Sequence, residues 1–188
     1  MLQARIDDTE AHPNPLPERF TREDLVLPAE GGFRGRSGWL PLPAFAAGAQ
    51  AVGFIDALNP APIVVSYQGK TAPSLYFVTL ELLLGGKVTV RPSDQIEFAG
   101  QRLKLDAMQC VTLPYPARDV LSYVPLLEVL RGGQQSRLKD KVVVLAYDGV
   151  QMHTFPTPLG PIKAHRLFNY ELSVLYEALA PHTPGAAK

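Results

Sequence analysis

The sequence predicts an α/β fold, a single layered domain with a mixed, mainly parallel central sheet flanked by helices. One observation is the apolar, mostly β-branched run at residues 142–146, which has no polar alternation. Such a run is typical of a strand covered on both faces. Another is that strand-like and helix-like segments alternate along the chain, as in layered α/β proteins. The third is the C-terminal segment 163–179, whose apolar face predicts a helix packed on the sheet.

Length and composition limit the function classes. The chain has 188 residues, the size of one compact domain, and its 18 Lys and Arg are balanced by 18 Asp and Glu. Without a net positive field, nucleic acid is not an expected partner. The single Cys110 excludes an internal disulfide and a multi-cysteine zinc site. No apolar run reaches the roughly 18 residues that span a bilayer, and the first residues lack the pattern of a signal peptide.

The first part of the chain predicts few regular elements. Residues 1–38 are rich in Pro, Gly and charged side chains, so we expect an extended N-terminal arm with one short strand around residues 25–27. A short helix is expected over residues 40–50, followed by the start of a strand at 51–55. The β-branched segment 63–68 predicts a further strand that ends in a turn.

The next helix has recognisable signals at both ends. Ser74 is a suitable N-cap, leucines follow at the spacing of a buried face, and the Gly-Gly pair at 85–86 ends the helix. Short strands are expected at residues 88–90, 96–98 and 102–105. The last two are separated by Ala-Gly-Gln, which predicts a hairpin.

The C-terminal half is organised around residues 138–164. A short helix is expected at 124–130, and a charged lead-in then precedes the predicted central strand at 142–146. After an irregular loop comes the terminal helix, which would complete a domain at residues 39–180 and leave a flexible tail at 181–188. Its apolar sector combines one face, Phe168, Leu172, Leu175 and Leu179, with the neighbouring Leu167, Tyr170, Val174 and Ala178.

Candidate site residues lie in the loop after the predicted central strand, where open α/β sheets often bind ligands. Asp148, His153 and His165 could form a metal or acid–base site. Their spacing matches neither a helical pair of metal ligands nor a nucleophile motif, so a polar loop with a capping histidine is the simpler interpretation. We therefore expect no metal, cofactor or catalytic residue. The predicted ligand-binding residues are Tyr147, Asp148, His153 and Phe155.

Two other patterns give weaker evidence for a binding site. The aromatic residues near the predicted sheet edge, among them Tyr147 and Phe155, could line a pocket but are more often part of a core. The glycine-rich run at 31–38 lacks the preceding strand and the Lys that a phosphate-binding loop uses, so it is interpreted as a linker.

Several short segments also occur in a characteristic order. They are Gly53-Phe54-Ile55, Ala72-Pro73-Ser74-Leu75, Leu105-Asp106-Ala107, Tyr123-Val124-Pro125, Val129-Leu130-Arg131-Gly132, Leu138-Lys139-Asp140-Lys141, Val142-Val143-Val144, Thr157-Pro158-Leu159-Gly160 and His165. This series, over about residues 39–179, resembles the second type of CHASE domain. That family consists of extracellular sensory modules attached to bacterial cyclases and histidine kinases.

The resemblance implies a non-catalytic sensory domain on the periplasmic or extracellular side of the bacterial inner membrane. The domain would be a soluble part of a membrane-anchored protein whose cytoplasmic effector is an adenylate cyclase, a diguanylate cyclase or a histidine kinase. The signal, a small molecule or a protein, is undefined, and the resemblance supplies no ligand-binding residues.

Three function hypotheses remain open. In the first, the domain relays a signal through its terminal helix, whose broad apolar sector could also form a homodimer; complete burial of that sector within one chain is the alternative. In the second, the chain is a solute-binding module that captures a small molecule without relaying a signal. The third, a hydrolase or transferase, would require turnover that depends on Asp148 or His153.

Overall fold

The computed structural model describes residues 1–6, 15–25, 32–55, 60–91, 95–115, 122–146, 148–150, 153–158 and 160–181. The chain divides into two compact units, which we call unit 1, Met1–Leu113 with Glu171–Lys188, and unit 2, Pro114–Tyr170. The boundary between Tyr170 and Glu171 falls inside the C-terminal helix. Predictions for Tyr147, for most of the strand at 25–27 and for the tail after residue 181 lie outside the described residues.

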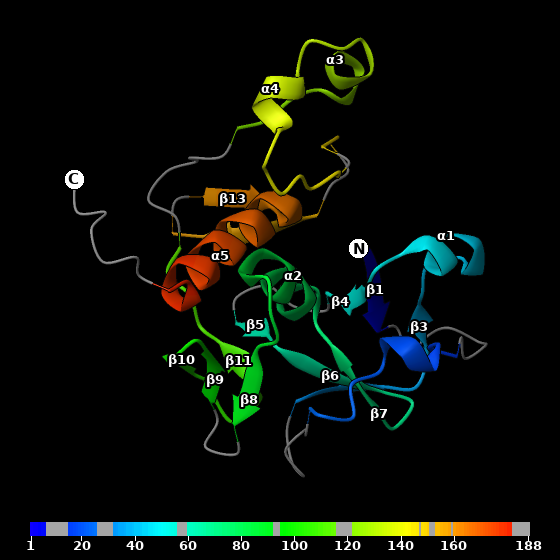
Figure 1. Ribbon diagram of the computed structural model, residues 1–188, viewed down its shortest axis with the longest axis vertical. Helices are drawn as coiled ribbons and strands as arrows, with labels where there is room; N and C mark the ends of the chain where they lie inside the picture. Colours follow the sequence, from blue (N-terminus) through cyan, green and yellow to red (C-terminus); the bar gives the residue numbers. More distant parts are fainter. Residues whose placement is uncertain are drawn as a thin grey trace. The chain divides into compact units, whose positions relative to one another are not determined.

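The strands form several small sheets instead of one large sheet (Figure 1). In unit 1, β1 is parallel to β4 and antiparallel to β3, and β6 is parallel to β2 and antiparallel to β7. The other pairings, β8 and β10 with β9, β5 with β11, and β12 with β13 in unit 2, are antiparallel. The strands are β1 (Leu2–Ile6), β2 (Phe33–Gly35), β3 (Gly38–Trp39), β4 (Val52–Phe54), β5 (Ala61–Pro62), β6 (Val64–Tyr67), β7 (Lys70–Pro73), β8 (Thr89–Arg91), β9 (Gln95–Phe98), β10 (Gln101–Lys104), β11 (Cys110–Val111), β12 (Thr154–Thr157) and β13 (Gly160–Lys163).

Four of the described helices lie where local sequence signals predicted them, whereas η1 and α4 were not predicted. The short helices at 40–50 and 124–130 are present as α1 and α3, and the terminal helix is α5. None of the described helices is long and apolar enough to cross a membrane. The helices are η1 (Glu18–Phe20), α1 (Pro43–Gly48), α2 (Leu75–Leu84), α3 (Leu126–Leu130), α4 (Gln135–Leu138) and α5 (Ala164–Leu179).

The described structure therefore mixes helices and strands, as the sequence predicted, but its sheets are small, and mixed or antiparallel. A single mainly parallel sheet is not what these residues form, because most of the strands have two to four residues and turns return the chain beside the preceding strand. The segment 1–38, expected as an arm, supplies β1, which pairs with β4, and the buried side chains of Ala4 and Phe20.

The predicted central strand at residues 142–146 is wrong. These residues form no strand, and three of them are well exposed, at 44% for Val142, 58% for Val143 and 76% for Leu145. A β-branched run forms a buried strand only where neighbouring strands take up its backbone hydrogen bonds and other elements cover its side chains. Among the described residues, no strand pairs with this segment, so its hydrophobicity alone did not place it in a core.

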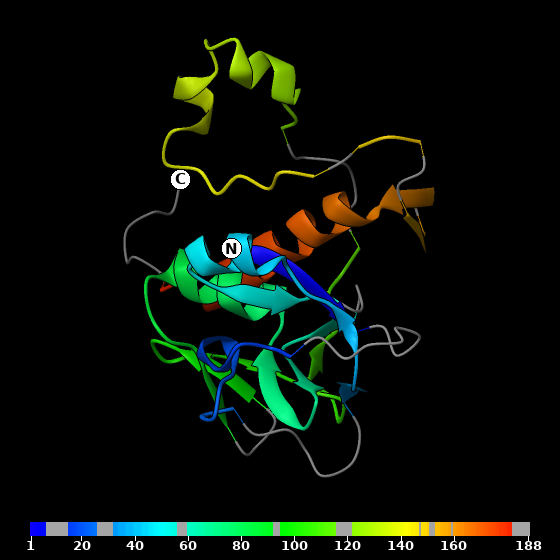
Figure 2. The ribbon, with the colours of Figure 1, turned by 90° about the vertical axis from the view of Figure 1, so that its right-hand side faces the viewer.

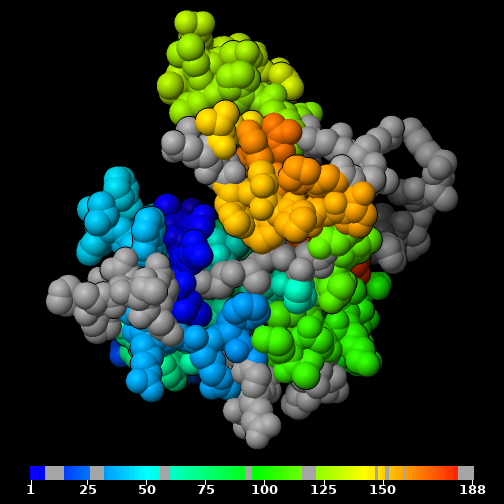
Figure 3. Space-filling view, turned by 180° about the vertical axis from the view of Figure 1, so that it is seen from behind, coloured from blue at the N-terminus to red at the C-terminus, as the bar shows by residue number. Residues whose placement is uncertain are grey.

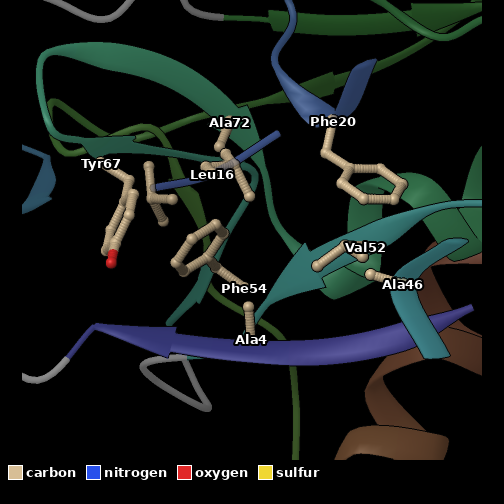
Figure 4. Packing of buried hydrophobic residues seen from close by; sticks show 9 residues of the cluster. Ala4, Leu16, Phe20, Ala46, Val52, Phe54, Tyr67 and Ala72 are labelled. Carbon is tan, nitrogen blue, oxygen red and sulfur yellow. The ribbon is translucent and has the colours of Figure 1, made fainter. Parts of the chain in front are cut away.

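A hydrophobic core of unit 1 lies between the β3-β1-β4 sheet and the β2-β6-β7 sheet. Figure 4 shows how Phe54 from β4 and Tyr67 from β6 meet, with ring centroids 5.2 Å apart. Around them pack buried side chains from the N-terminal segment, from α1 and from β7. Burying aromatic rings of this size contributes several kcal/mol of hydrophobic free energy, by about 25 cal/mol per Å². The cluster consists of Ala4, Leu16, Phe20, Ala46, Val52, Phe54, Val65, Tyr67 and Ala72.

α2 has the ends that its sequence predicted. The Ser74 side chain accepts a hydrogen bond from the backbone N–H of Phe77 at 3.1 Å, as an N-cap does, and Gly85 ends the helix in the left-handed conformation with φ of 68°. The helix packs closely on β1 and β4, as Figures 1 and 2 show. Gly53 allows this approach, since a Cβ there would lie 2.4 Å from the Cα of Leu75.

Candidate functional site

The β12–β13 hairpin of unit 2 positions most of the predicted site residues. Thr154 pairs with Lys163, and Phe155 pairs with Ile162, so the start of α5 returns to the beginning of β12. There the backbone N–H of Ala164 donates a hydrogen bond to the carbonyl of His153 at 3.0 Å. The hairpin, in yellow and orange, forms part of the surface drawn in Figure 3. The hairpin thus brings residues that follow β13 next to the loop that precedes β12.

Asp148 lies at the centre of the resulting cluster. Its Oδ1 is 2.8 Å from the Lys163 Nζ and 3.3 Å from the His165 Nε2, and its Oδ2 accepts a hydrogen bond from Arg166 at 3.0 Å. The Lys163 ammonium also donates to the carbonyl oxygen of Asp148, at 2.7 Å. Both carboxylate oxygens are therefore held by basic side chains. Hydrogen bonds between such charged groups are shorter and stronger than hydrogen bonds between neutral groups. We call Asp148, Lys163, His165 and Arg166 the Asp148 cluster.

The Asp148 cluster carries an excess of positive charge. The hydrogen bond from Lys163, followed by that from Arg166, holds the pKa of Asp148 below its usual range, so this carboxyl is ionised at neutral pH. Burial lowers the pKa of His165, and the charges of Arg166 and Lys163 lower it further, against the opposing effect of Asp148. Because its pKa is lowered, the His165 side chain is mostly neutral at pH 7. One carboxylate then faces two cations.

One aromatic residue contacts the cluster, and another aromatic pair lies at the start of β12. The guanidinium of Arg166 lies 4.1 Å from the ring centroid of Tyr123, a cation–π contact that helps to orient it. His153 and Phe155 meet edge to face at 4.7 Å, and the His153 side chain is exposed. Of the predicted site residues, the structure thus brings Asp148 and His165 together, while the backbone carbonyl of His153 binds Ala164, between Lys163 and His165.

The cluster holds groups of opposite charge together. Asp148 and His165 form a carboxylate–imidazole pair, and Lys163 and Arg166 engage the same carboxylate. No group of three or more His, Cys, Asp or Glu in the described part of the chain is placed to hold a metal ion. Lys163 and Arg166 were not among the predicted residues. Their signal in the sequence was the presence of basic residues at the first turn of a helix, where its dipole favours acidic ones.

A second titratable pair lies in the core of unit 1. Glu171 in α5 is 0% exposed, and its Oε2 accepts a hydrogen bond from the hydroxyl of Tyr76 in α2 at 2.5 Å. Its other oxygen, Oε1, is buried and has no hydrogen-bond partner among the residues that the structure describes. Burial raises the pKa of Glu171 to about 7, against the opposing effect of the Tyr76 hydrogen bond. The sequence did contain one signal that Glu171 would be buried, because this residue lies on the predicted apolar face of the helix with Phe168, Leu172 and Leu175.

Comparison of the chain with protein-family models, curated proteins and solved structures finds no match.

Unit 1 contains concave surface that the sequence did not indicate. One pocket of about 520 Å³ is lined by residues of η1, β4 and α2, including Arg19, Arg22 and Glu81. Arg22 there binds Glu81 at 2.7 Å and Asp24 at 2.6 Å, so its charge is already balanced by carboxylates. None of the lining residues belongs to the Asp148 cluster, and the Arg22 and Glu81 side chains in the lining bind each other. It therefore gives a weaker argument for a ligand than the Asp148 cluster does.

Proposed function

We propose that the chain is a non-catalytic sensory domain of a bacterial transmembrane signalling protein, positioned on the extracytoplasmic side of the inner membrane. In this proposal the cytoplasmic effector is a cyclase, a diguanylate cyclase or a histidine kinase. The resemblance in segment order to the second type of CHASE domain supports the location and the effector class. The observation that carries the sensory role is that the Asp148 cluster is built at the first turn of α5, the last helix among the described residues.

In this proposal, a change in the contacts of the Asp148 cluster acts directly on α5. His165 and Arg166 belong to α5, and Lys163 immediately precedes it, so any change in their partners acts on the start of the helix. The helix continues for 16 residues to Leu179, a length of about 24 Å at 1.5 Å per residue. A ligand shifts such an element only if it binds one of its arrangements better than another, and a charged cluster provides that difference.

The proposal leads to a test in the parent protein. Asp148→Asn should change effector output by about threefold or more, because the variant removes the anion that holds Lys163 and Arg166. The measurement is cyclic nucleotide or phosphorylated protein formed per minute by membranes that contain the full-length protein. Glu97→Gln is the matched control, since Glu97 is also held by two cations, Arg91 at 2.8 Å and Arg102 at 2.9 Å, but lies in the β8–β10 sheet of unit 1.

Unchanged output from Asp148→Asn, or equal changes from both variants, would contradict a role of the cluster in relay. The solute-binding alternative would then be favoured, provided that the domain still binds a ligand. A parent reading frame without flanking membrane segments and without a cyclase or kinase would argue against the signalling proposal as a whole.

We also propose a homodimer that uses the outer side of α5. The first predicted face is buried, as shown by Leu172 at 4% and Leu175 at 0% exposure, whereas Tyr170, Val174 and Ala178 beside it are only half-buried. Partial exposure of an apolar stripe leaves area for a second copy of the helix.

Sedimentation equilibrium should therefore show a mass that rises with concentration toward twice that of the chain. Val174→Glu should lower the association constant by about tenfold or more, because it introduces a charge into the half-buried stripe. Tyr176→Gln, at an exposed position on the other side of the helix, should leave association nearly unchanged. A chain that remains monomeric at millimolar concentration would rule out this form of the proposal.

A further inference from the structure

Two Pro-Leu-Pro tripeptides line another pocket in unit 1. They are Pro15-Leu16-Pro17, just before η1, and Pro41-Leu42-Pro43, at the start of α1. Together with parts of η1, α1 and β4, they surround a cavity of about 540 Å³. Pockets for small molecules usually have volumes of about 300–1,000 Å³. The cavity is therefore large enough for a small-molecule ligand.

The walls of this pocket are apolar and conformationally restricted. Proline fixes its own φ and has no N–H group, so the four prolines leave few backbone donors in the walls. Pro17 (φ −55°, ψ 135°) and Leu42 (φ −52°, ψ 141°) are extended, each directly before a helix. The buried side chains of Phe20, Ala46 and Val52 also line the pocket and lie close together in Figure 4. Such walls suit an apolar ligand, because a pre-formed pocket needs little reordering on binding.

Arg19 is the one charged residue among the described residues that line this pocket. Its guanidinium donates hydrogen bonds to the backbone carbonyls of Ala46 and Ala47, the latter at 3.4 Å. It also lies 4.4 Å from the ring centroid of Phe20. These contacts hold the guanidinium in place. Because a guanidinium has five N–H donors, the two hydrogen bonds leave donors for a ligand.

The charge of Arg19 is not balanced in the way that the charge of Arg22 is balanced in the pocket of about 520 Å³. Arg22 binds two carboxylates, one of them Glu81 at 2.7 Å. Among the described residues, no carboxylate pairs with Arg19, and its neighbour Glu18 contacts Lys70 instead, at 3.4 Å. Arginine pairs well with a carboxylate, through parallel hydrogen bonds to both oxygens. The pocket therefore combines apolar walls with one cation that an anionic ligand can neutralise.

The segment that forms one wall also leaves apolar surface exposed at this pocket. Leu42 lines the pocket and is 66% exposed, and Phe45, three residues further on in α1, is 67% exposed. Residues 37–55 contain no charged side chain. Exposed apolar groups that adjoin one another are typical of a binding site, because a ligand that covers them removes apolar area from water.

We propose that this pocket binds an amphipathic small molecule whose apolar body lies between the two Pro-Leu-Pro tripeptides and whose single carboxylate pairs with Arg19. A carboxylate is the preferred anion because one arginine balances its one charge, whereas a phosphate monoester carries about −1.5 to −2 at pH 7. All the residues of this site lie in unit 1, and none belongs to the Asp148 cluster. The inference goes beyond the sensory function proposed above and holds whether or not the chain relays a signal.

Calorimetric titration of the whole chain with octanoate tests this site. The reference ligand is 1-octanol, which has an apolar chain of the same length without the charge. Octanoate should bind saturably and about tenfold more tightly than 1-octanol. Arg19→Met should weaken octanoate binding by about tenfold and leave 1-octanol binding unchanged, because methionine keeps an unbranched apolar chain but has no charge.

Two further variants locate the bound ligand. Leu42→Asp should weaken octanoate binding by about tenfold, because it places a carboxylate in the apolar wall. Leu42 is the N-cap of α1, where aspartate is favourable, so this variant keeps the helix. Lys87→Met is the matched control, since Lys87 is an exposed cation that lines the pocket of about 520 Å³ but not this one. It should leave octanoate binding unchanged.

Each other outcome contradicts the proposal. Octanoate that shows no saturable binding up to about 10 mM overturns it. Equal weakening of octanoate and 1-octanol by Arg19→Met would mean that Arg19 only maintains the structure of the pocket. A loss in Lys87→Met as large as that in Arg19→Met would place the ligand in the other pocket or reflect net charge alone.

Two additional measurements complete the test. Binding of the chain to phosphatidylglycerol vesicles, without binding of octanoate, would make the exposed apolar surface a membrane contact and overturn the small-molecule assignment. Circular dichroism establishes that each variant is folded before titration. If Arg19→Met does not fold, the preference of the unchanged protein for octanoate over 1-octanol and its loss in Leu42→Asp decide the question.

Discussion

Gly53→Ala should lower the free energy of unfolding by about 3 kcal/mol or more. Gly53 lies in the middle of β4, where the strand passes the first turn of α2. A Cβ at this position would lie 2.4 Å from the Cα and 2.7 Å from the backbone nitrogen of Leu75, and 2.8 Å from the carbonyl oxygen of Ser74. These are backbone atoms, so no side-chain rotation relieves the overlap and the helix itself has to move.

The displacement would also weaken two neighbouring features. Ser74 is the N-cap of α2, and Phe54, next to Gly53, is one of the aromatic residues at the centre of the unit 1 core. Urea unfolding followed by circular dichroism gives the change in free energy. A Gly53→Ala protein within about 1 kcal/mol of the unchanged chain would contradict the close approach of β4 and α2.

Gly48→Ala is the matched control for this prediction. Gly48 is the last residue of α1, and a Cβ there would have no heavy atom within 4 Å. Since alanine is a better helix former than glycine by up to about 1 kcal/mol, the substitution should be neutral or slightly stabilising. The pair separates the effect of the added methyl group at a packed backbone contact from the loss of glycine flexibility.

Raising the pH from about 4 to about 9 should lower the free energy of unfolding through Glu171 by about 3 kcal/mol. Burial raises the pKa of this carboxyl to about 7 in the folded chain, from a value of 4.5 without burial. Between these two values the folded state binds more protons than the unfolded state. The contribution of Glu171 to stability is therefore largest below pH 4.5, falls as the pH rises through 7, and levels off above it.

Glu171→Gln isolates this contribution from the other titrating groups. The amide stays neutral, so the variant should lose the part of the pH dependence that lies between about pH 4.5 and 7. Tyr76 does not titrate in this interval, because burial raises the pKa of its hydroxyl well above 10. Tyr76→Phe removes the hydrogen bond that stabilises the carboxylate, so it should move the transition of Glu171 to a higher pH.

The measurement is urea unfolding at a series of pH values for the three proteins. The difference between the curves of the unchanged chain and Glu171→Gln gives the titration of this one residue. Parallel curves would mean that Glu171 is solvated in the folded protein, in contradiction to its complete burial beside Tyr76.

Several local elements could be predicted from the sequence because their signals are local. Ser74 and Gly85 set the ends of α2 through a side-chain cap and a left-handed turn, and both act within one helical turn. The hairpin of β9 and β10 follows from two short strands on either side of Ala99-Gly100. Both of these turn residues have positive φ. The repeat of apolar residues likewise predicted α5 at nearly its observed bounds, Ala164–Leu179.

The candidate site was only partly predictable. Asp148 and His165 were recognised as polar residues near a loop and do meet at 3.3 Å. Lys163 and Arg166 were missed, since their role depends on the register of the β12–β13 hairpin, which returns the start of α5 to the loop at residue 148. Charged side chains along a sequence do not reveal which of them will share a partner.

By itself, the sequence determined the positions of α1, α2, α3 and α5, the ends of α2 and the general mixture of helices and strands, because propensity, capping and periodicity act over a few residues. Only the tertiary structure decided which apolar segments are buried. It leaves residues 142–146 exposed and without a pairing strand in the described chain. It also buries Glu171 against Tyr76, a residue 95 positions away. Burial depends on neighbours that are distant in the sequence, and the hydrophobicity of a segment does not contain that information.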